Sequence, residues 1–467
     1  MLLLSLCILL QWDPDFRLTN HSFIDRTSPN FCKNISIDRR GNIHVVWEAY
    51  LPRWRLFYRK YNGTIWLPET LLVTGVEVVR SQFPTILPDT SNNLHLVFED
   101  ERSIGGWQCI RIFYKKWDPA GWRPDTALTD SWAFLRPSLA IDTSNKLHLA
   151  MMQCGRPGKI LYKRFNGIFW EKETTLARLK GADTKPFTNP KIITGLQGSL
   201  HLVWSDDTTG NYEIYYKKYN GRSWERDTML TNCIESSVEP SVACDSRGRL
   251  HLVWQDFRFG TWDIFYKRFN GTSWEPETLL VSVDYIKEHP QIAVDKQDRL
   301  HLVWSDYRHG ESEIYYKCYD GTGWSPDIRI TNAPGHSREP FICIDDSNRL
   351  HLLWTDQRDG GNEEIYYKRL NITEIKEDSR WRITDNQLKI WPNPAKADVR
   401  LQIYQRSEVK SQKQEIRLKV YDITGKLVKE VCTTDNIITF RLSNPGIYFV
   451  KLYNDKEITT GKIVVIK

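Results

Sequence analysis

The sequence contains no CxxC pair, and its nine cysteines are scattered along 467 residues. An odd number of scattered cysteines without a CxxC pair supports neither a zinc site nor a disulfide framework, and we expect no metal and no cofactor. Methionine is also scarce, with 4 residues, whereas tryptophan reaches 19 and tyrosine 21. Such an excess of tryptophan is typical of a packing position that the chain uses many times, and it suggests internal repeats.

A long hydrophobic run is missing as well. The longest apolar stretch, MLLLSLCILL at residues 1–10, is shorter than the roughly 20 residues that a bilayer requires, so we predict no membrane-spanning segment. We interpret residues 1–11 as the remnant of an export signal whose basic start is missing. The alternative is a short buried strand.

The charge of the chain is unevenly distributed. The formal net charge is +6, but residues 388–467 alone carry +7, which leaves the rest of the chain close to neutral at −1. A nucleic-acid-binding face requires clustered basic residues, and the paired Lys and Arg that follow the repeated Tyr-Tyr instead recur around the chain. We therefore expect no nucleic-acid partner and associate the positive charge with the C-terminal region.

A repeat of about 50 residues organises most of the chain. The phrase LHLVW and its variants recur seven times, with the histidine at His44, His95, His148, His201, His251, His301 and His351. Each period contains four short stretches rich in β-branched and aromatic residues, bounded by Gly, Pro, Asn or Asp. This spacing is typical of propeller blades of four strands.

The two ends of the repeat region complement each other. We expect the fourth strand of each period to start at a tryptophan, and the first of these, at Trp12, precedes any complete blade. The last period, which ends near Leu370, lacks a fourth strand. We therefore predict an all-β protein with a seven-bladed β-propeller over residues 12–370, in which residues 12–19 complete the seventh blade and remove its free edge.

A second recurring phrase connects the third and fourth strands. It reads YNGTIW at residues 61–66, FNGTSW at 269–274 and YDGTGW at 319–324. Asn-Gly or Asp-Gly supplies the positive φ angles of a tight hairpin turn, and the tryptophan can then pack between blades. This phrase resembles a reduced Asp-box of the sialidase-type (BNR-repeat) propellers. The resemblance implies the propeller fold but not activity, because the Asp-box is a structural turn in that family.

The C-terminal region has a different pattern. Residues 371–387 are predicted to form a linker, and residues 388–467 alternate apolar and polar residues around turn signals, as in a small immunoglobulin-like β-sandwich. The phrases WPNPA, LKVYDITGKLVKEV and LSNPGIYFVKL resemble the C-terminal sorting domain of proteins exported by the type IX secretion system. The resemblance implies a secreted or outer-membrane surface-attached protein, with the type IX machinery as a partner. The alternative is an immunoglobulin-like domain that only packs on the propeller.

The face of the ring that carries the longer loops is where we expect binding. Here a proline recurs at the entry to each innermost strand, while the residue before it varies: Ser28, Phe83, Arg136, Asn189, Glu239, His289 and Glu339. A fixed scaffold with a variable channel mouth would produce this pattern. Our ligand-binding candidates from this set are Arg136, Glu239, His289 and Glu339, together with Arg338; solvated loop residues are the alternative.

A second set of candidates follows the repeated tryptophan in three consecutive blades. An aspartate lies two residues before an arginine, in the pairs Asp256 and Arg258, Asp306 and Arg308, and Asp356 and Arg358. Such a carboxylate can cap a turn and form a local ion pair. The functional alternative is a cluster of arginines that binds the carboxylate of an acidic sugar.

The residues do not identify a catalytic machinery. A sialidase requires arginines around the substrate carboxylate, a Tyr activated by a Glu and a carboxylic acid near the leaving oxygen, and no such residue can be assigned in this chain. The phrase FLRPS at residues 134–138 fits the local version of the first strand. The seven repeated histidines, one in each blade, are expected to form structural hydrogen bonds rather than share a metal.

Three functions remain open at this stage. The first is an exported propeller that binds a glycan or a surface protein through its long-loop face without catalysis. The second is an exo-sialidase-type glycoside hydrolase that acts on acidic sugars. The third is a purely architectural surface protein.

Overall fold

The computed structural model describes residues 11–27, 33–75, 77–104, 107–130, 134–155, 157–179, 188–360 and 362–371, and, nearer the C-terminus, residues 386–391, 398–405, 416–422, 427–433, 437–442, 446–453 and 458–465. The chain divides into two units, Met1–Thr373 and Glu374–Lys467. Residues 1–10 of the predicted export-signal remnant, residues 372–385 of the predicted linker 371–387, and Ser28 lie outside the described parts. The ends of the predicted linker belong to strands, because Asn371 ends the strand Glu364–Asn371 and residues 386 and 387 begin the strand Asn386–Trp391.

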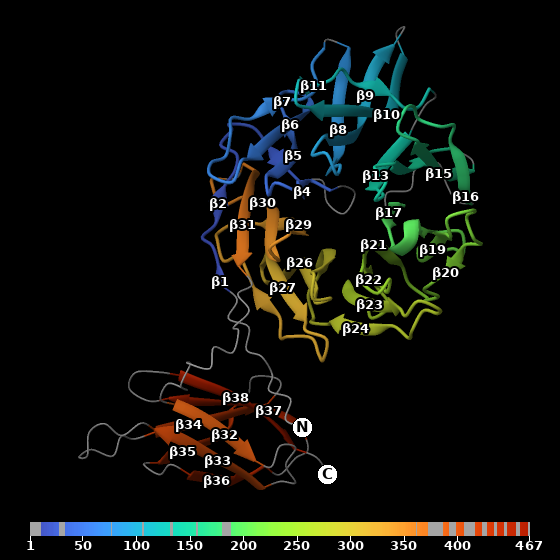
Figure 1. The fold of residues 1–467 in the computed structure, drawn as a ribbon. Coiled ribbons are helices and arrows are strands. Elements are labelled where there is room, and N and C mark those ends of the chain that lie inside the picture. The colour runs from blue at the N-terminus through green and yellow to red at the C-terminus, as the bar shows by residue number, and fades with distance from the viewer. Residues whose placement is uncertain are drawn as a thin grey trace. The chain divides into compact units, whose positions relative to one another are not determined.

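The first unit is a ring of seven antiparallel sheets (Figure 1). Blade 1 consists of β3 (Asp25–Arg26), β4 (Ile35–Ile37), β5 (Ile43–Tyr50), β6 (Trp54–Tyr61) and β7 (Thr70–Leu71). Blade 2 consists of β8 (Val78–Pro88), β9 (Leu94–Ile104), β10 (Trp107–Asp118), β11 (Gly121–Trp122) and β12 (Thr126–Ala127). Blade 3 consists of β13 (Phe134–Ile141), β14 (Leu147–Gln153), β15 (Gly158–Phe165) and β16 (Thr174–Leu179).

The remaining blades repeat the same order of strands. Blade 4 consists of β17 (Lys191–Thr194), β18 (Leu200–Asp206), β19 (Glu213–Tyr219) and β20 (Thr228–Met229), with the short 3-10 helix η1 (Leu196–Gly198) between its first two strands. Blade 5 consists of β21 (Ser237–Cys244), β22 (Leu250–Asp256), β23 (Asp263–Phe269) and β24 (Thr278–Val281). Blade 6 consists of β25 (Lys287–Val294), β26 (Leu300–His309), β27 (Glu311–Tyr319) and β28 (Ile328–Arg329).

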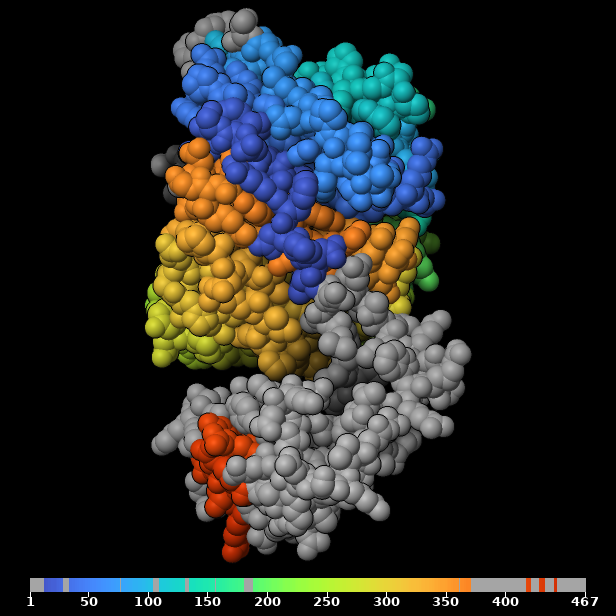
Figure 2. Space-filling model, turned by 90° about the vertical axis from the view of Figure 1, so that its left-hand side faces the viewer, coloured from blue at the N-terminus to red at the C-terminus, as the bar shows by residue number. Residues whose placement is uncertain are grey.

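Blade 7 is built from both ends of the ring. Its first three strands are β29 (Ser337–Ile344), β30 (Arg349–Asp356) and β31 (Glu364–Asn371), and its outer edge is formed by β1 (Gln11–Trp12) and β2 (Phe16–Arg17). Trp12 pairs with Leu370 and Phe16 with Tyr367, so the start of the chain closes the ring as predicted. Figure 2 shows this dark blue segment lying against the orange seventh blade. The closure removes the free edge that β31 would otherwise present.

The core lies between adjacent blades because the second strand of each blade is buried on both faces. In β22, all seven residues are buried, including the Trp254 of its LHLVW phrase. Trp254 of blade 5 belongs to one hydrophobic cluster with Val203 and Tyr216 of blade 4 and Val242 of its own blade. Dispersion and area burial across each such interface stabilise the stacking of neighbouring sheets.

The turn phrase has the expected local geometry, but in blades 1, 3, 4, 5 and 6 the fourth strand begins four residues after its tryptophan. In YNGTIW, Oδ1 of Asn62 accepts the backbone N–H groups of Thr64 and Ile65, at 3.0 and 2.9 Å. Trp66 then forms one isolated bridge with Tyr61, and β7 starts only at Thr70. The prediction that this strand starts at its tryptophan was therefore wrong. Blades 3 and 4 show the same four-residue interval between the bridged tryptophan and the strand, from Trp170 to Thr174 and from Trp224 to Thr228.

The same tryptophans pack between blades, as predicted. Trp224 meets Tyr162 of the preceding blade edge to face, with ring centroids 5.2 Å apart. Trp274 meets Tyr216 in the same way at 5.2 Å. Such edge-to-face pairs add about 0.5–1.5 kcal/mol beyond the area they bury.

The second unit contains two antiparallel sheets. One has the order β32 (Asn386–Trp391), β33 (Asp398–Gln405), β36 (Ile437–Arg441), and the other the order β35 (Leu427–Thr433), β34 (Ile416–Asp422), β37 (Gly446–Tyr453), β38 (Ile458–Val465). All these pairings are antiparallel, in agreement with the predicted all-β character of this region. Its immunoglobulin-like packing stays a prediction.

Candidate functional site

A left-handed residue occupies the same position in five blades. It is the residue before the repeated proline: Phe83, Arg136, Glu239, His289 and Glu339 have φ angles between 54° and 59°. At each of these positions the pairing of the first and second strands shifts register, which is the signature of a β-bulge. These five residues, called the rim residues below, lie in the first strands of their blades, toward the long-loop face.

The backbone of the rim residues is held by the preceding blade. The amide of Phe83 donates to Oε1 of Glu48 at 2.7 Å, and that of Glu339 donates to Oγ of Ser305 at 3.1 Å. The amide of His289 donates to Oε1 of Gln255 at 3.3 Å. In every case the acceptor is the residue that follows the second-strand tryptophan. The bulge therefore links neighbouring blades while it aims a variable side chain away from the ladder.

This conformation is costly for residues other than glycine. A left-handed φ costs an L-residue about 1–2 kcal/mol, whereas glycine adopts it freely. None of the five rim positions is a glycine, although the chain places Gly63, Gly221 and Gly271 at positive φ in its hairpin turns. Strain of this kind is characteristic of functional sites.

Three rim residues form a charged cluster. Nδ1 of His289 lies 3.0 Å from Oε2 of Glu239 in the neighbouring blade. Burial alone would lower the pKa of His289, but Glu239, Glu339 and Glu288 raise it to about 9. On the other side, burial raises the pKa of Glu339, against the opposite effect of His289, Arg338 and Arg26. The rim thus holds an imidazolium between carboxylates.

A second cluster surrounds Arg136. Its guanidinium carbon lies 4.1 Å from the centre of the Phe83 ring, and its backbone amide donates to Oε1 of Glu99 at 2.5 Å. Burial raises the pKa of Glu99 to about 7, even though Arg136 lowers it. Glu48 acts on the pKa of both Glu99 and Glu339, so the acidic groups of blades 1, 2 and 7 face a shared region. A carboxyl group that titrates near neutral pH is suited to acid–base chemistry.

Glu48 and Glu99 were not among the residues selected from the sequence. Both follow the aromatic residue that ends the LHLVW phrase, where the other blades have Ser205, Gln255, Ser305, Thr355 and Met152. A carboxylate at a position where the other blades have neutral side chains departs from the repeat. This departure could have identified Glu48 and Glu99 from the sequence. Both side chains are buried, with Glu48 at 0% and Glu99 at 5% exposure.

Asn189 and Arg338 differ from the five rim residues. Asn189 also precedes a proline but is not left-handed, and it is 1% exposed. Neither its Oδ1 nor its Nδ2 has a hydrogen-bond partner in the described part of the chain. Arg338, a sequence-selected candidate, forms an ion pair with Glu363. Its guanidinium is therefore already partly engaged.

The Asp–Arg pairs are arranged as turn caps. Arg258 binds Asp256 through two parallel contacts, Nε to Oδ1 and Nη2 to Oδ2, both at 2.7 Å. The same carboxylate also accepts the indole N–H of Trp254 at 2.9 Å. The pairs Asp306–Arg308 and Asp356–Arg358 repeat this geometry.

Each of these guanidinium groups also lies over an aromatic ring of the same blade. The guanidinium carbons of Arg258, Arg308 and Arg358 are 4.1, 4.3 and 4.3 Å from the ring centres of Phe265, Tyr315 and Tyr366. With both the carboxylate and the ring engaged, the geometry favours the turn-capping interpretation over a ligand-binding arginine cluster.

The repeated histidines form buried hydrogen bonds. Nδ1 of His301 lies 2.8 Å from the hydroxyl of Tyr316, and its Nε2 lies 3.2 Å from Oδ2 of Asp295. Burial lowers the pKa of His301 and raises that of Tyr316, so a neutral imidazole accepts from the tyrosine and donates to the aspartate. The other blades repeat the contact to tyrosine at 2.8 Å. The histidines therefore have the structural role that the sequence predicted.

No described group of three or more His, Cys, Asp and Glu is arranged to hold a metal ion. In the same described part of the chain, no helix has the length and apolar character needed to cross a bilayer.

Comparison with protein families identifies the C-terminal unit. Residues 389–467 match the family described as secretion system C-terminal sorting domain. The protein is exported. As a carrier of the type IX sorting domain, it is secreted or attached to the outer-membrane surface, as predicted from its resemblance to such domains. No curated protein sequence matches the chain.

Solved structures share the propeller fold. A protein of unknown function from Dyadobacter fermentans DSM 18053 is 14% identical, with a TM-score of 0.51 over 78% of this chain and 99% of that one. A polysaccharide lyase, the PL25 ulvan lyase, is 10% identical, with a TM-score of 0.53 over 74% of this chain and 93% of that one. The Hadza microbial sialidase Hz136 is 16% identical over 70% and 73% of the two chains, with a TM-score of 0.42. At these identities the likeness concerns the fold.

Proposed function

We propose that the propeller binds a glycan with acidic sugars at the rim of its long-loop face. The observation that supports this proposal is the set of five strained rim residues, four of which carry ionisable side chains. The same strained backbone position recurs in five blades, and its side chain and surroundings differ from blade to blade. We interpret this as selection for binding by these side chains rather than for packing. In this function the rim binds the glycan, and the sorting domain directs export of the protein.

The chemistry of the rim suits an acidic sugar chain. Arg136 and the imidazolium of His289 can bind carboxylate or sulfate groups through charge-assisted hydrogen bonds. Glu239 and Glu339 can accept hydrogen bonds from sugar hydroxyls, and Phe83 offers an aromatic face. A propeller of the same fold is the ulvan lyase solved bound to -[GlcA(1-4)Rha3S]-, an acidic and sulfated sugar chain. That relative supports the choice of ligand class for this rim.

A second candidate function is cleavage of the same kind of glycan. The observation that favours it is Glu99, a buried carboxyl with a pKa of about 7 whose neighbour Arg136 could hold an acidic substrate. A group of this pKa can exchange a proton at neutral pH. This candidate covers the sialidase-type alternative raised from the sequence, but it requires a nucleophile or base that we do not assign.

The experiment that separates these functions uses the full chain. Binding to an array of acidic and neutral glycans is measured together with release of reducing ends from every glycan that binds. Saturable binding without release supports a binding protein, and release abolished by Glu99→Gln supports the enzyme. Binding to proteins alone, with no glycan retained, would contradict both.

A further inference from the structure

Exposed aromatic side chains gather on the long-loop face of blades 5 and 6. Phe259, in the loop between β22 and β23, is 63% exposed, and Tyr285, in the loop before β25, is 52% exposed. Exposed rings forgo the stabilisation that burial would give them, and a group of them on a soluble domain marks an interaction site. The half-buried Phe257, Trp262 and Tyr307 belong to the same group, and the five residues are called the aromatic band below.

The band departs from the repeat. The loop between the second and third strands reads FRFGTW at residues 257–262 of blade 5, YRHGES at 307–312 of blade 6 and QRDGGN at 357–362 of blade 7. The glycine recurs because the turn needs it, since Gly260, Gly310 and Gly360 all have a positive φ. The three aromatic rings of blade 5 do not recur, so the turn does not require them.

Contacts between blades 5 and 6 join the band into one surface. The ring centroids of Phe257 and Trp262 are 5.1 Å apart. The carbonyl of Trp262 accepts the backbone N–H of Lys287 at 3.2 Å, and the carbonyl of Ile286 accepts that of Tyr307 at 3.1 Å. The loop between the two blades therefore lies between the aromatic residues of one blade and those of the next.

The band reaches the rim at His289. The hydroxyl of Tyr307 donates to Oε2 of Glu288 at 3.2 Å, and Glu288 directly precedes His289. Tyr285 comes four residues before His289, so their Cα atoms are at most about 14 Å apart. A ligand that binds the charged rim can therefore extend onto the band.

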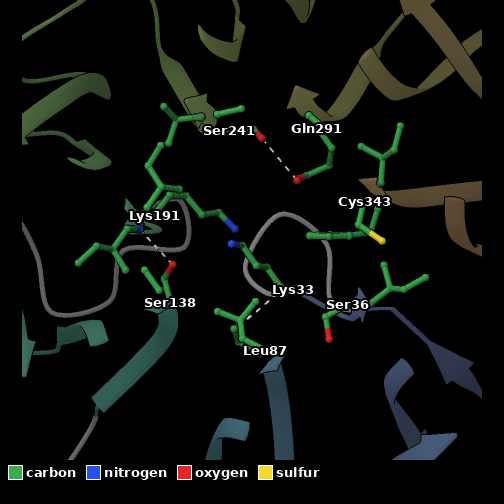
Figure 3. Close-up of a pocket in the computed structure, with 18 of the residues that line it drawn as sticks. Lys33, Ser36, Leu87, Ser138, Lys191, Ser241, Gln291 and Cys343 are labelled. Atoms are coloured by element: carbon green, nitrogen blue, oxygen red, sulfur yellow. Dashed lines mark hydrogen bonds between the residues drawn. The ribbon is translucent and has the colours of Figure 1, made fainter. Parts of the chain in front are cut away.

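The other direction from the rim leads into a cavity of 470 Å³ at the centre of the ring. Figure 3 shows Ser241 and Gln291 in its lining, and each comes two residues after a rim residue. Among the described lining residues Phe341 alone is aromatic, and it is buried. The described lining thus offers no exposed ring face, and the surface on which sugars can stack is the band.

We propose that the aromatic band extends the rim site and holds further sugar units of the same glycan. This inference rests on the proposed function of the rim. One face of a pyranose ring consists of C–H groups and its edge carries hydroxyls, so a sugar packs on an aromatic ring while polar neighbours bind its hydroxyls. Phe259 and Tyr285 supply exposed rings, and Glu288 supplies an acceptor beside the ring of Tyr307.

Charged groups within the band favour a glycan over a protein as its occupant. The core of a protein interface is depleted of charged residues. In the band, Glu288 contacts Tyr307. The ring of Phe265 packs against Phe259, with centroids 6.2 Å apart, and the guanidinium carbon of Arg258 lies 4.1 Å from the same ring. Rings and charged groups thus alternate, which suits a chain of sugars that presents both C–H faces and hydroxyls.

The test is isothermal titration of the full chain, at constant ionic strength, with galacturonic acid oligomers of two, four and six units. Fragments of the same lengths are used from every other acidic glycan retained on the array. Because a longer fragment reaches the band as well as the rim, we expect the affinity to rise roughly tenfold from two units to six. Equal affinities at all lengths would overturn the extension and leave the rim as the whole site. Failure of every acidic fragment to bind would overturn the proposed function of the rim together with its extension.

Matched variants locate the added sugars. Phe259→Ala and Tyr285→Ala should each weaken binding of the six-unit fragment roughly three- to tenfold, the effect of one stacking contact, and leave binding of the two-unit fragment unchanged. The control is Phe169→Ala, which removes a ring of 59% exposure from a hairpin turn on the short-turn face and should change neither affinity. If Phe259→Ala and Tyr285→Ala bind the six-unit fragment as tightly as the wild type does, the proposal is wrong. The length series uses the unmodified chain and so does not depend on the folding of a variant.

Discussion

The imidazole of His289 and the carboxylate of Glu239 lie 3.0 Å apart, although 50 residues separate them along the chain. Each precedes the proline of its own blade, and each adopts a left-handed φ, of 57° and 55°. The repeat therefore brings one sequence position from neighbouring blades into direct contact. Where that position carries opposite charges, the ring acquires a polar cluster that no single blade contains.

The pH dependence of stability should report this pair. The pKa of His289 in the folded state, about 9, lies above its ordinary value of 6.5. Protonated His289 therefore contributes stability that is complete below pH 6.5 and is lost as the pH rises through 9. Urea unfolding across this range should show the loss in the wild type and a smaller loss in Glu239→Gln.

The control for this experiment is Glu275→Gln, which removes a carboxylate from a half-buried pair with Arg268. It should leave the pH dependence between 6.5 and 9 unchanged. If His289 titrates at its ordinary value in an NMR experiment on the wild type, the charged cluster is wrong.

The left-handed rim can be tested by comparing glycine with alanine. Both Glu339→Gly and Glu339→Ala lose the side chain, including the 3.3 Å contact with Thr355, but only alanine keeps the strain. We expect the glycine variant to be more stable by about 1 kcal/mol in urea unfolding. At Glu288, which is extended, the order should reverse, with alanine more stable by roughly 0.5–1 kcal/mol. The same order at both positions would argue against the strain.

Removal of the tyrosine hydroxyl that binds a repeated histidine should lower the free energy of unfolding. Tyr316→Phe leaves Nδ1 of the buried His301 without its donor, and unfolding should become easier by about 1–3 kcal/mol. Tyr319→Phe removes a hydroxyl that binds the exposed carbonyl of Gly321, so its effect should stay within about 0.5 kcal/mol. Equal effects of the two substitutions would show that the buried hydrogen bond is not a source of stability.

The sorting domain predicts where the protein is found in the cell. Deletion of residues 388–467, which contain the matched family, should retain the propeller in the periplasm. Cell fractionation followed by detection of the propeller measures this distribution. Unchanged delivery to the surface or medium would show that the propeller travels without its C-terminal unit.

Much of the fold could be predicted because the same strand and turn motifs recur in each repeat. The period, the turn phrase and the unpaired strand at Trp12 together predicted the ring and its closure. The predicted start of the fourth strands was wrong in blades 1, 3, 4, 5 and 6, because the tryptophan there forms only an isolated bridge and the ladder resumes four residues later. Repetition thus predicts architecture better than it predicts strand limits.

The candidate site was only partly visible in the sequence. The rim column led to Arg136, Glu239, His289 and Glu339, but the buried carboxylates Glu48 and Glu99 belong to the second strand and meet the rim only in the assembled ring. Each of these carboxylates accepts a backbone N–H from a rim residue of the next blade, about 35 residues further along the chain. The sequence pattern alone could not predict these contacts.

The most direct test of the central claim is the affinity of the full chain for an acidic oligosaccharide selected from the array, measured for the wild type and Arg136→Ala. The control is Arg247→Ala, at a side chain 72% exposed on the short-turn face. Binding at the rim predicts a loss of about tenfold or more for Arg136→Ala and no change for Arg247→Ala. Equal affinity of Arg136→Ala and the wild type would contradict it.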